Sequence, residues 1–198
     1  MKKSMNIFLV LSFALYVNSA FSQSTSAASV GLYKNEDDFS RHKLTYSFNC
    51  GSTQDAIKTN NFFESQKLIV KTNDKKIVLL KKDFFGYHAC NGKDYRFYKS
   101  QMLEIADTTA FYLYQHTALE PGNGGKGYAT VTKYYFSKTG TSEVQSLTVA
   151  NLEEAFSSNA KFRYALENYY ARNDKGLMDY DPYGKMYKIK YLFAESLK

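Results

Sequence analysis

The spacing of the apolar residues changes about two thirds of the way along the chain, near Gly140. Before this point, apolar and polar residues tend to alternate, as they do in a β-strand with one buried face. After it, apolar residues recur every three or four positions, which is the spacing of one face of a helix. Strands followed by helices predict an α+β fold, with an antiparallel β-meander of hairpins in the N-terminal two thirds and two or three C-terminal helices.

Several segments show the strand pattern. In 43–50 every second residue is apolar, from Leu44 to Cys50. The runs 67–72 and 76–81 flank a short polar turn and predict a hairpin. Further strands are predicted at 102–106, at 110–116 and, across the glycine-rich loop 121–127, at 128–137.

A second hairpin is predicted where Asn91 and Gly92 separate the strand-like runs 84–90 and 93–98. Asn-Gly is the residue pair that best tolerates the positive φ angles of a type I′ turn. We therefore expect a two-residue loop of that type here.

Two helices are predicted directly after the change of spacing. A short one runs from about Thr148 to Phe156, and the polar residues up to Asn159 offer a cap for the next. In that second helix Phe162, Leu166 and Tyr169, together with Ala165, should form one apolar stripe.

Pro182 suits the first turn of a last helix, because its fixed φ and missing N–H are tolerated there. The expected apolar stripe of this helix contains Met186, Ile189 and Phe193. Its lysines should lie mostly off the stripe; they are Lys185, Lys188 and Lys190.

The N-terminus has the features of an export signal. Two lysines precede an apolar run at 7–17 that is too short to be a permanent membrane anchor. The small residues that follow favour cleavage before Gln23, with a cut after Ala20 as the neighbouring option. We therefore predict a signal peptide over residues 1–22 and a mature protein that is periplasmic or extracellular.

The mature chain is expected to have a disordered leader at 23–29 and a single α+β domain at 30–198, a length suited to one core. It would carry 24 basic and 19 acidic residues, a formal charge of +5. Basic and acidic residues are interspersed along the chain, whereas a nucleic-acid-binding protein concentrates its basic residues in a stripe or arm. The sequence therefore argues against a nucleic-acid partner. There is no tryptophan among the many aromatic residues, which disfavours a sugar-binding platform.

Cys50 and Cys90 are the only cysteines. Each follows a predicted strand and precedes a glycine turn, so neighbouring strands could bring them together. In an oxidising compartment an even number of cysteines favours a disulfide, with two buried free thiols as the alternative.

Each candidate motif for a cofactor or metal site in this sequence is incomplete. Lys126 in the glycine loop is followed by glycine rather than by Ser or Thr, so the loop is no phosphate-binding motif. The acidic turn at 179–181 lacks later calcium ligands and is expected to be a turn capped by Asp181. His88 and Cys90 would share a strand face, but two ligands do not make a metal site. We expect no cofactor and no metal.

No catalytic motif stands out, and we expect a protein that is not an enzyme. The sequence has no Gly-x-Ser-x-Gly turn that would expose a nucleophile. Two carboxylates from separate loops could still meet in space as a hydrolase pair. The acids at strand or loop ends are Asp83, Glu104, Asp107 and Glu120.

The chain resembles a family of uncharacterised exported bacterial proteins. The resemblance rests mainly on Phe85-Gly86-Tyr87, Asn91-Gly92-Lys93 and Tyr95-Arg96-Phe97-Tyr98. Shorter matching stretches are 31–33, 37–39, 132–137 and 185–189. The resemblance implies one exported domain and no particular activity.

Three functions remain as hypotheses. The first is a non-enzymatic binding domain for an envelope protein or polymer, using its sheet or its glycine loop. The second is a carboxylate-dependent hydrolase of an envelope polymer. The third is a basic surface that binds an anionic polymer or lipid. It requires a cluster of lysines on one face, formed by Lys71, Lys75, Lys76, Lys81 and Lys82.

For the binding hypothesis, we select Tyr87, His88 and Arg96 around the Asn91 hairpin as exposed anchors, because Tyr and Arg are frequent at interface hot spots.

Overall fold

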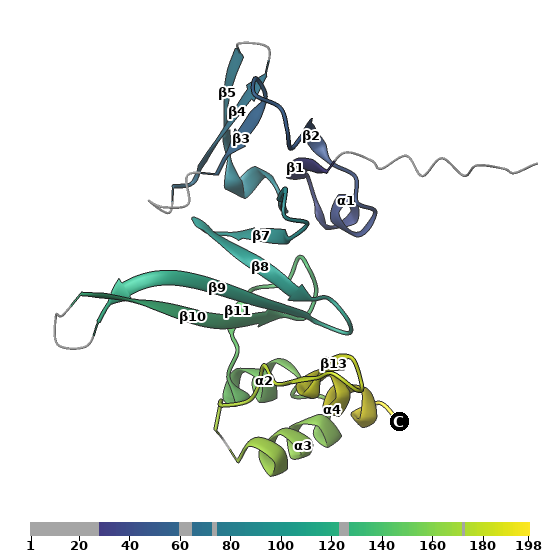
Figure 1. The fold of residues 1–198 in the computed structure, drawn as a ribbon. Coiled ribbons are helices and arrows are strands. Elements are labelled where there is room, and N and C mark those ends of the chain that lie inside the picture. The colour runs from purple at the N-terminus through teal and green to yellow at the C-terminus, as the bar shows by residue number, and fades with distance from the viewer. Residues whose placement is uncertain (1–27, 60–64, 73–74, 123–126, 172) are drawn as a thin grey trace, which may run out of the picture.

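An eight-stranded antiparallel sheet runs through the middle of the molecule, with a three-stranded sheet at one end and most of the helices at the other (Figure 1). Strands dominate the N-terminal two thirds and helices follow, which confirms the predicted α+β fold. The predicted signal peptide, most of the leader and the centre of the glycine loop lie outside the described residues. The computed structural model describes residues 28–59, 65–72, 75–122, 127–171 and 173–198.

From β6 to β10, strands that follow one another in the sequence are also neighbours in the large sheet, so this part is the expected meander. The order across the sheet is β11-β10-β9-β8-β7-β6-β1-β2. The bounds are Ser29–Tyr33 (β1), Thr45–Asn49 (β2), Gly86–His88 (β6), Asp94–Tyr98 (β7), Gln101–Asp107 (β8), Tyr112–Pro121 (β9), Tyr128–Ser137 (β10) and Gln145–Ser146 (β11).

Two smaller sheets accompany it. The three-stranded sheet contains the hairpin predicted at 67–81, which the structure confirms. Its strands are Ala56–Lys58 (β3), Lys67–Thr72 (β4) and Lys75–Leu80 (β5), followed by the 3-10 helix Lys81–Asp83 (η2). A short pair is formed by Tyr180–Asp181 (β12) and Met186–Tyr187 (β13).

The helices are Glu36–Ser40 (α1), Val149–Ala155 (α2), Ala160–Tyr170 (α3) and Lys188–Ser196 (α4). The side chain of Thr148 caps α2 and that of Asn159 caps α3, each by accepting a backbone N–H three residues later. Such caps satisfy N–H groups that have no partner inside the helix. None of the described helices is long and apolar enough to cross a membrane.

One core cluster joins the helices to the base of β9 and β10. Phe111 and Phe136 from the sheet side meet Leu152, Phe162 and Ile189 from the helices. A second cluster joins the three-stranded sheet to the other end of the large sheet. It contains Leu68 and Val70 from β4 and, across from them, Leu32, Phe97 and Met102.

The buried stripe of α3 differs from the predicted one. Tyr169 is 47% exposed, whereas Tyr170 is 5% exposed and belongs to the core with Phe162 and Leu166. The stripe therefore advances in steps of four residues, i, i+4 and i+8. Both spacings are compatible with one helix face, and packing against the sheet selects between them.

The prediction for the last helix is wrong at its start. Pro182 lies in the turn between β12 and β13, where the carboxylate of Asp181 accepts the N–H of Tyr183, as expected for a turn capped by Asp181. The helix begins only at Lys188. Asp181 satisfies the backbone of the turn locally, so no helix forms after the proline.

Lys190, which the sequence places off the apolar stripe of this helix, is only 2% exposed. Its Nζ donates to the carbonyl oxygens of Thr109 and Phe111 and lies 3.4 Å from the carboxylate of Asp107. The residues that precede β9 thus supply the oxygen ligands that make this burial possible.

The turn at Asn91 is also not of the predicted type. Gly92 has a φ of +77°, but Asn91 does not share a positive φ, and a type I′ turn needs both. Instead the N–H of Gly92 donates to the carbonyl of Ala89, and the N–H of Ala89 to the carbonyl of Lys93. This is a three-residue loop, a turn followed by one left-handed glycine.

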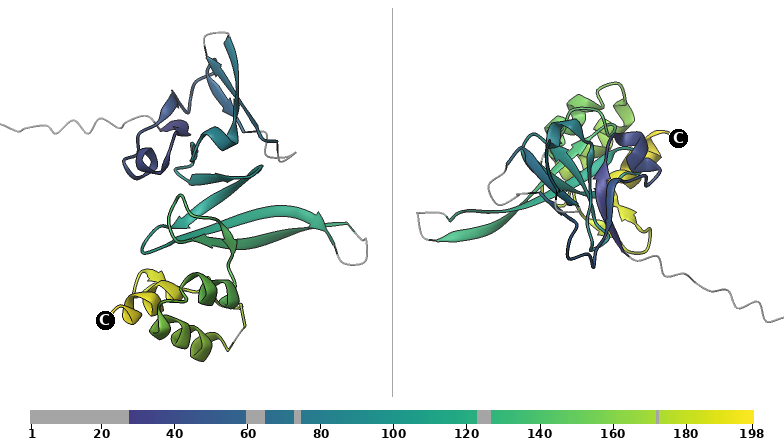
Figure 2. Two further views of the ribbon diagram at one scale, coloured as in Figure 1. Left: turned by 180° about the vertical axis from the view of Figure 1, so that it is seen from behind. Right: turned by 90° about the horizontal axis from the view of Figure 1, so that it is seen from above.

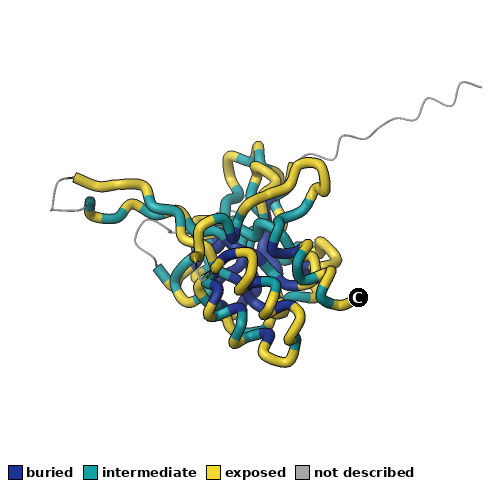
Figure 3. Tube along the Cα trace, turned by 90° about the horizontal axis from the view of Figure 1, so that it is seen from below, coloured by how far each residue is buried: buried dark blue, intermediate teal, exposed yellow. Residues whose placement is uncertain are grey.

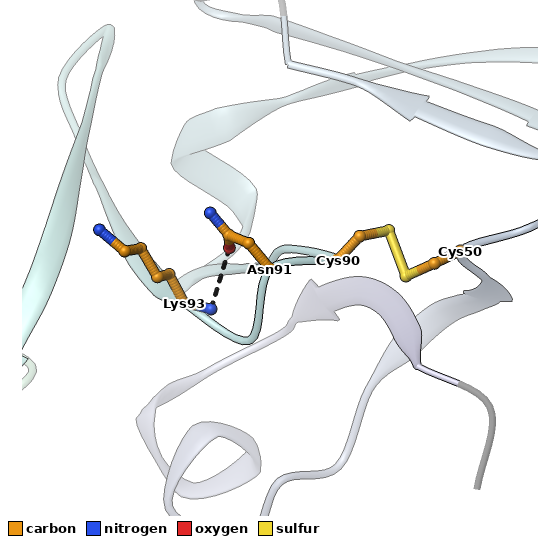
Figure 4. The surroundings of a disulfide bond; sticks show 4 residues. All are labelled: Cys50, Cys90, Asn91 and Lys93. Atoms are coloured by element: carbon orange, nitrogen blue, oxygen red, sulfur yellow. Dashed lines mark hydrogen bonds between the residues drawn. A yellow bond between two sulfur atoms is a disulfide. The ribbon is translucent and has the colours of Figure 1, made fainter. Parts of the chain in front are cut away.

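Cys50 and Cys90 form a disulfide, with their Cα atoms 5.6 Å apart (Figure 4). Cys90 belongs to the three-residue loop just described, and the side chain of Asn91 next to it accepts the backbone N–H of Lys93. Cys50 follows β2, the outermost strand of the large sheet. The bond therefore fastens this edge to the β6–β7 hairpin.

The outer parts of β9 and β10 extend from the body as a two-stranded ribbon (Figure 2). Every described residue of this ribbon beyond Tyr114 and before Phe136 is exposed or only partly buried (Figure 3). We refer to 115–122 with 127–135 as the ribbon. It leaves the body where its neighbour β8 turns away.

Candidate binding site

Strands β8 and β9 diverge and leave a wedge between them. Their pairing includes Asp107 with Leu113 and ends at Glu104 with Gln115. Beyond Gln115, β9 continues to Pro121 and pairs only with β10 within the described chain. We call this wedge the fork. One side is formed by the start of β8 and the residue before it, Ser100 to Met102, and the other by His116 to Leu119 of β9.

An open cavity of about 1050 Å³ occupies the fork. Its size matches the upper end of the range for sites that enclose ligands of drug size. The lining combines rings and aliphatic chains with hydrogen-bonding groups. The apolar part of the lining includes Tyr95, Met102, Leu119 and Tyr128, and the hydrogen-bonding part includes Glu104 and Gln115.

The free edge of β9 presents backbone groups to the fork. Gly122 donates to Gly127 across the ribbon, and Tyr134 accepts the N–H of Leu147 on the opposite side. Backbone groups of successive residues in a strand point alternately to one neighbour and to the other. It follows that the N–H and C=O of Thr117 and Leu119 point away from β10 and into the fork.

This edge ends at Pro121, which has no N–H. Proline on an exposed edge is one of the features that limit uncontrolled strand pairing. The part of the edge that can pair with another strand is therefore short and lies inside the fork, at Thr117 and Leu119.

The inner end of the fork is closed by His116. Its Nδ1 donates to the carbonyl oxygen of Met102 at 3.1 Å. By the same alternation, Met102 has its backbone groups turned toward β9, where the regular pairing has stopped. The imidazole thus takes the place of the missing strand partner and holds the two strands apart in a defined geometry.

The other side of the fork is held by a buried lysine. Lys81, from η2, is fully buried, and its Nζ donates to the carbonyl oxygen of Ser100 at 2.7 Å. This bond fixes the turn between β7 and β8. Both sides of the fork are therefore positioned before any ligand arrives, which reduces the entropy lost on binding.

The charge inside the fork is locally balanced. Glu104 forms an ion pair with Lys93, with a distance of 2.8 Å between Nζ and Oε1. The hydrogen bond that Lys93 donates to the carboxylate of Glu104 raises the pKa of Lys93. The fork consequently offers rings, amides and hydroxyls rather than a strong net charge.

Two large apolar side chains at the mouth of the fork are exposed. Leu119 is 65% and Tyr128 is 77% exposed. Both line the open cavity, so their apolar surface is available to a ligand.

The three anchors predicted around the Asn91 hairpin do not share one surface. Tyr87 pairs with Tyr95, while His88 pairs with Asp94, so their side chains project from opposite faces of the sheet. The ring of Tyr87 is half-buried against Tyr95, and this burial raises its pKa. Tyr95 lines the fork, which places Tyr87 beside the cavity.

Arg96 was expected to be exposed and is 8% exposed instead. Its Nη1 donates to the hydroxyls of Tyr114 and Ser137, and its Nη2 to the carbonyl of Ser142, all within 2.9 Å. Its guanidinium also lies over the rings of Phe85 and Tyr114. Arg96 therefore joins β7 to β9 and β10 in the interior, and a direct contact with a partner is not open to it.

His88 and Asp94 belong to a small polar cluster. The Nδ1 of His88 lies 2.7 Å from Oδ1 of Asp94, and the hydroxyl of Tyr33 donates to the same oxygen at 2.9 Å. Burial and the carboxylate of Asp94 raise the pKa of Tyr33. Among the described residues, no serine, threonine or cysteine hydrogen-bonds to His88, so the geometry ties β1, β6 and β7 together rather than activating a nucleophile.

Three of the four acids that could have formed a hydrolase pair are each paired with a different lysine. Of the four, only Glu104 lines the cavity. Asp107 faces Lys190 on the side of the helices, and Glu120 pairs with Lys133 on the ribbon. The described residues also contain no group of three or more His, Cys, Asp or Glu side chains that could hold a metal ion.

Comparison with known proteins gives no match, whether against family models, curated proteins or solved structures.

The fork was not predicted from the sequence. The strand expected at 110–116 stops where the observed β9 continues to Pro121. The sequence contains no clear signal for this extension, because Thr117-Ala118-Leu119-Glu120 does not alternate between polar and apolar residues; the alternation of exposure along it is seen only in the structure. The divergence of β8 from β9 also depends on pairing register, which a strand pattern does not contain.

Proposed function

We propose that the protein is an exported, non-enzymatic binding module that takes up an extended segment of a partner protein in the fork. The observation that supports this most strongly is the free edge of β9, which borders a cavity of about 1050 Å³. The disulfide is compatible with an oxidising location outside the cytoplasm.

A polypeptide strand matches the fork better than a compact ligand does. The backbone groups of Thr117 and Leu119 are spaced to pair with every second residue of an added strand. Main-chain hydrogen bonds of this kind supply affinity, while pockets for alternate side chains supply specificity.

The lining indicates which segments should bind. Tyr95, Met102 and Leu119 can accept aromatic or aliphatic side chains from alternate positions of the added strand. Gln115 and Glu104 offer amide and carboxylate groups to the polar positions between them. We therefore expect an extended segment with alternating apolar and polar residues.

Two proline substitutions test the two edges of the ribbon separately, one the edge that faces the fork and the other the outer edge. Thr117→Pro removes an N–H that faces the fork. Thr132→Pro removes an N–H on the outer edge of β10, beyond the reach of β11, which pairs only with Tyr135 and Phe136. Thr117 and Thr132 are cross-strand partners with hydroxyl oxygens 3.0 Å apart, so both variants lose the same side-chain contact.

The probe is a displayed library of random twelve-residue peptides, selected on the wild-type protein and measured by fluorescence polarisation. We expect selected peptides with alternating apolar residues that bind Thr132→Pro as they bind the wild type. Binding to Thr117→Pro should be at least tenfold weaker, because about one net hydrogen bond is lost and the added strand is obstructed. A failure to select any peptide, or equal binding by the two variants, would contradict the proposal.

A further inference from the structure

The outer face of the three-stranded sheet is rich in lysine. Leu68, Val70 and Ile77 point inward to the core, so the alternate residues of β3, β4 and β5 point outward. The outward rows contain no acidic residue. They place Lys71 opposite Lys76, put Lys58 in line with Ile69 and Val78, and place Lys67 opposite Leu80.

The four lysines of this face are exposed, and within the part of the chain that the structure describes none of them is in an ion pair. Lys71 and Lys76 stand directly opposite each other on neighbouring strands. Like charges in this position destabilise a sheet. An anionic partner outside the chain would relieve the repulsion.

The structure corrects the lysine cluster expected from the sequence. Lys71 and Lys76 share the outer face, but Lys75 belongs to an inward row at the end of the hairpin. Lys81 is buried and bonded to Ser100. Lys58 and Lys67, which the sequence did not single out, complete the face instead.

The centre of the face is aliphatic. Val78 is 55% exposed, and its row neighbour Ile69 is partly exposed. Lysine side chains can lay their alkyl stems along such a surface and extend the ammonium group to a polar layer. The three strands offer a face of roughly 10 by 20 Å, estimated from strand spacing and rise.

These features discriminate between anionic partners. Surfaces that bind single-stranded nucleic acid combine a basic groove with aromatic side chains on which bases stack. The outward rows of this sheet contain no aromatic residue. A planar face with an aliphatic centre and surrounding lysines fits the interface of a lipid bilayer, where apolar groups enter the headgroup region and lysines meet phosphate.

We propose that the outer face of the three-stranded sheet docks the protein onto a lipid bilayer that carries anionic headgroups. This surface lies at the end of the molecule opposite helices α2, α3 and α4 and belongs to other strands than the fork (Figure 1). The docked protein would therefore keep the fork available for a partner. The inference goes beyond the proposed function, and either can fail without the other.

The test is co-sedimentation of the purified exported chain, with the same N-terminus in every variant, with phosphatidylcholine vesicles and with vesicles that contain one quarter phosphatidylglycerol. The wild type should bind only the anionic vesicles. Lys71→Gln with Lys76→Gln should lower the partition coefficient about 30-fold, because each lysine near an anionic surface contributes about fivefold. Val78→Asn should weaken binding while leaving the charge unchanged.

The matched control is Lys161→Gln with Lys175→Gln, which removes two exposed charges on and after α3, at the other end of the molecule. It should bind almost as the wild type does. Equal losses in the two double variants would overturn the proposal, because net charge alone would then explain the binding. So would binding to soluble inorganic polyphosphate without binding to anionic vesicles, which would identify a polyanion as the ligand.

Folding does not confound the comparison. Replacing Lys71 and Lys76 removes a repulsive pair from the surface, so the double variant should be at least as stable as the wild type. Thermal unfolding of each variant, followed by circular dichroism, checks this before the vesicle experiment.

Discussion

Lys190 should make the stability of the protein rise as the solution becomes moderately alkaline. Burial lowers the pKa of its ammonium group from 10.5 to about 8, although the nearby carboxylate of Asp107 acts in the opposite direction. Between pH 8 and pH 10.5 the unfolded chain therefore keeps a proton on this residue that the folded chain has released. Stability increases with pH wherever the unfolded state binds more protons.

The size of the effect follows from this shift. One pKa unit corresponds to about 1.4 kcal/mol, and integration from pH 7 to pH 9.5 gives a gain of about 2 kcal/mol from Lys190. Below pH 7 both states are protonated and the contribution is constant. Tyrosines such as Tyr33 and Tyr112, whose pKa values are raised by burial, begin to oppose the gain only as the unfolded phenols ionise near pH 10.

The perturbation is Lys190→Met, which keeps an apolar side chain of similar length. The variant leaves the carbonyls of Thr109 and Phe111 without the ammonium donor, and this cost does not depend on pH. Urea unfolding of both proteins at pH 7, 8, 9 and 9.5 gives the free energies. The difference between them should change by about 2 kcal/mol in favour of the wild type over this range. Parallel curves would refute the argument.

Three further changes test the packing. Arg96→Lys should lower stability by about 3 kcal/mol, since an ammonium cannot make the three bonds of the buried guanidinium; a loss below 1 kcal/mol in urea unfolding would show that the site is tolerant. Tyr170→Phe should stabilise by about 1 kcal/mol, because the Tyr170 hydroxyl is the buried side-chain group without a hydrogen-bond partner among the described residues; a lower melting temperature would contradict this. Replacing both Cys50 and Cys90 by alanine should cost about 4 kcal/mol for a loop of 40 residues, and an unchanged guanidinium midpoint would argue against the bond.

Local patterns predicted the elements whose interactions are also local. The β4–β5 hairpin follows from two β-rich runs around a polar turn, and the cap at Asn159 follows from a side chain that bonds three residues ahead. The disulfide was predicted from two cysteines at strand ends in a chain that the sequence predicts to be exported. In each case the decisive contact is short in sequence or allows only one pairing.

Burial of charged residues was not predicted, because it depends on distant partners. Lys190 is buried since carbonyl groups about 80 residues away surround its ammonium group. Arg96 is buried since the strand order brings Tyr114, Ser137 and Ser142 around it. A sequence pattern treats a charged residue as a surface residue, and only the assembled sheet shows otherwise.

The candidate site was missed for a related reason. The fork arises where β8 and β9 stop pairing, and His116 replaces the absent partner of Met102. Strand propensity can mark both segments as extended, but it does not determine where two strands separate. Of the three residues chosen from the sequence, only Tyr87 lies beside the fork, through its contact with Tyr95; His88 projects from the opposite face of the sheet and Arg96 is buried.

The most direct test of the fork is amide hydrogen exchange, measured by NMR on the protein alone and saturated with a peptide selected on it. In the free protein the amides of Thr117 and Leu119 should exchange rapidly, as should that of Thr132 on the outer edge. Peptide binding should slow exchange at Thr117 and Leu119 by about 100-fold or more, because these N–H groups become donors to the added strand, and should leave Thr132 unchanged. Protection that appears elsewhere, with Thr117 and Leu119 still exchanging as in the free protein, would show that the fork is not the binding site.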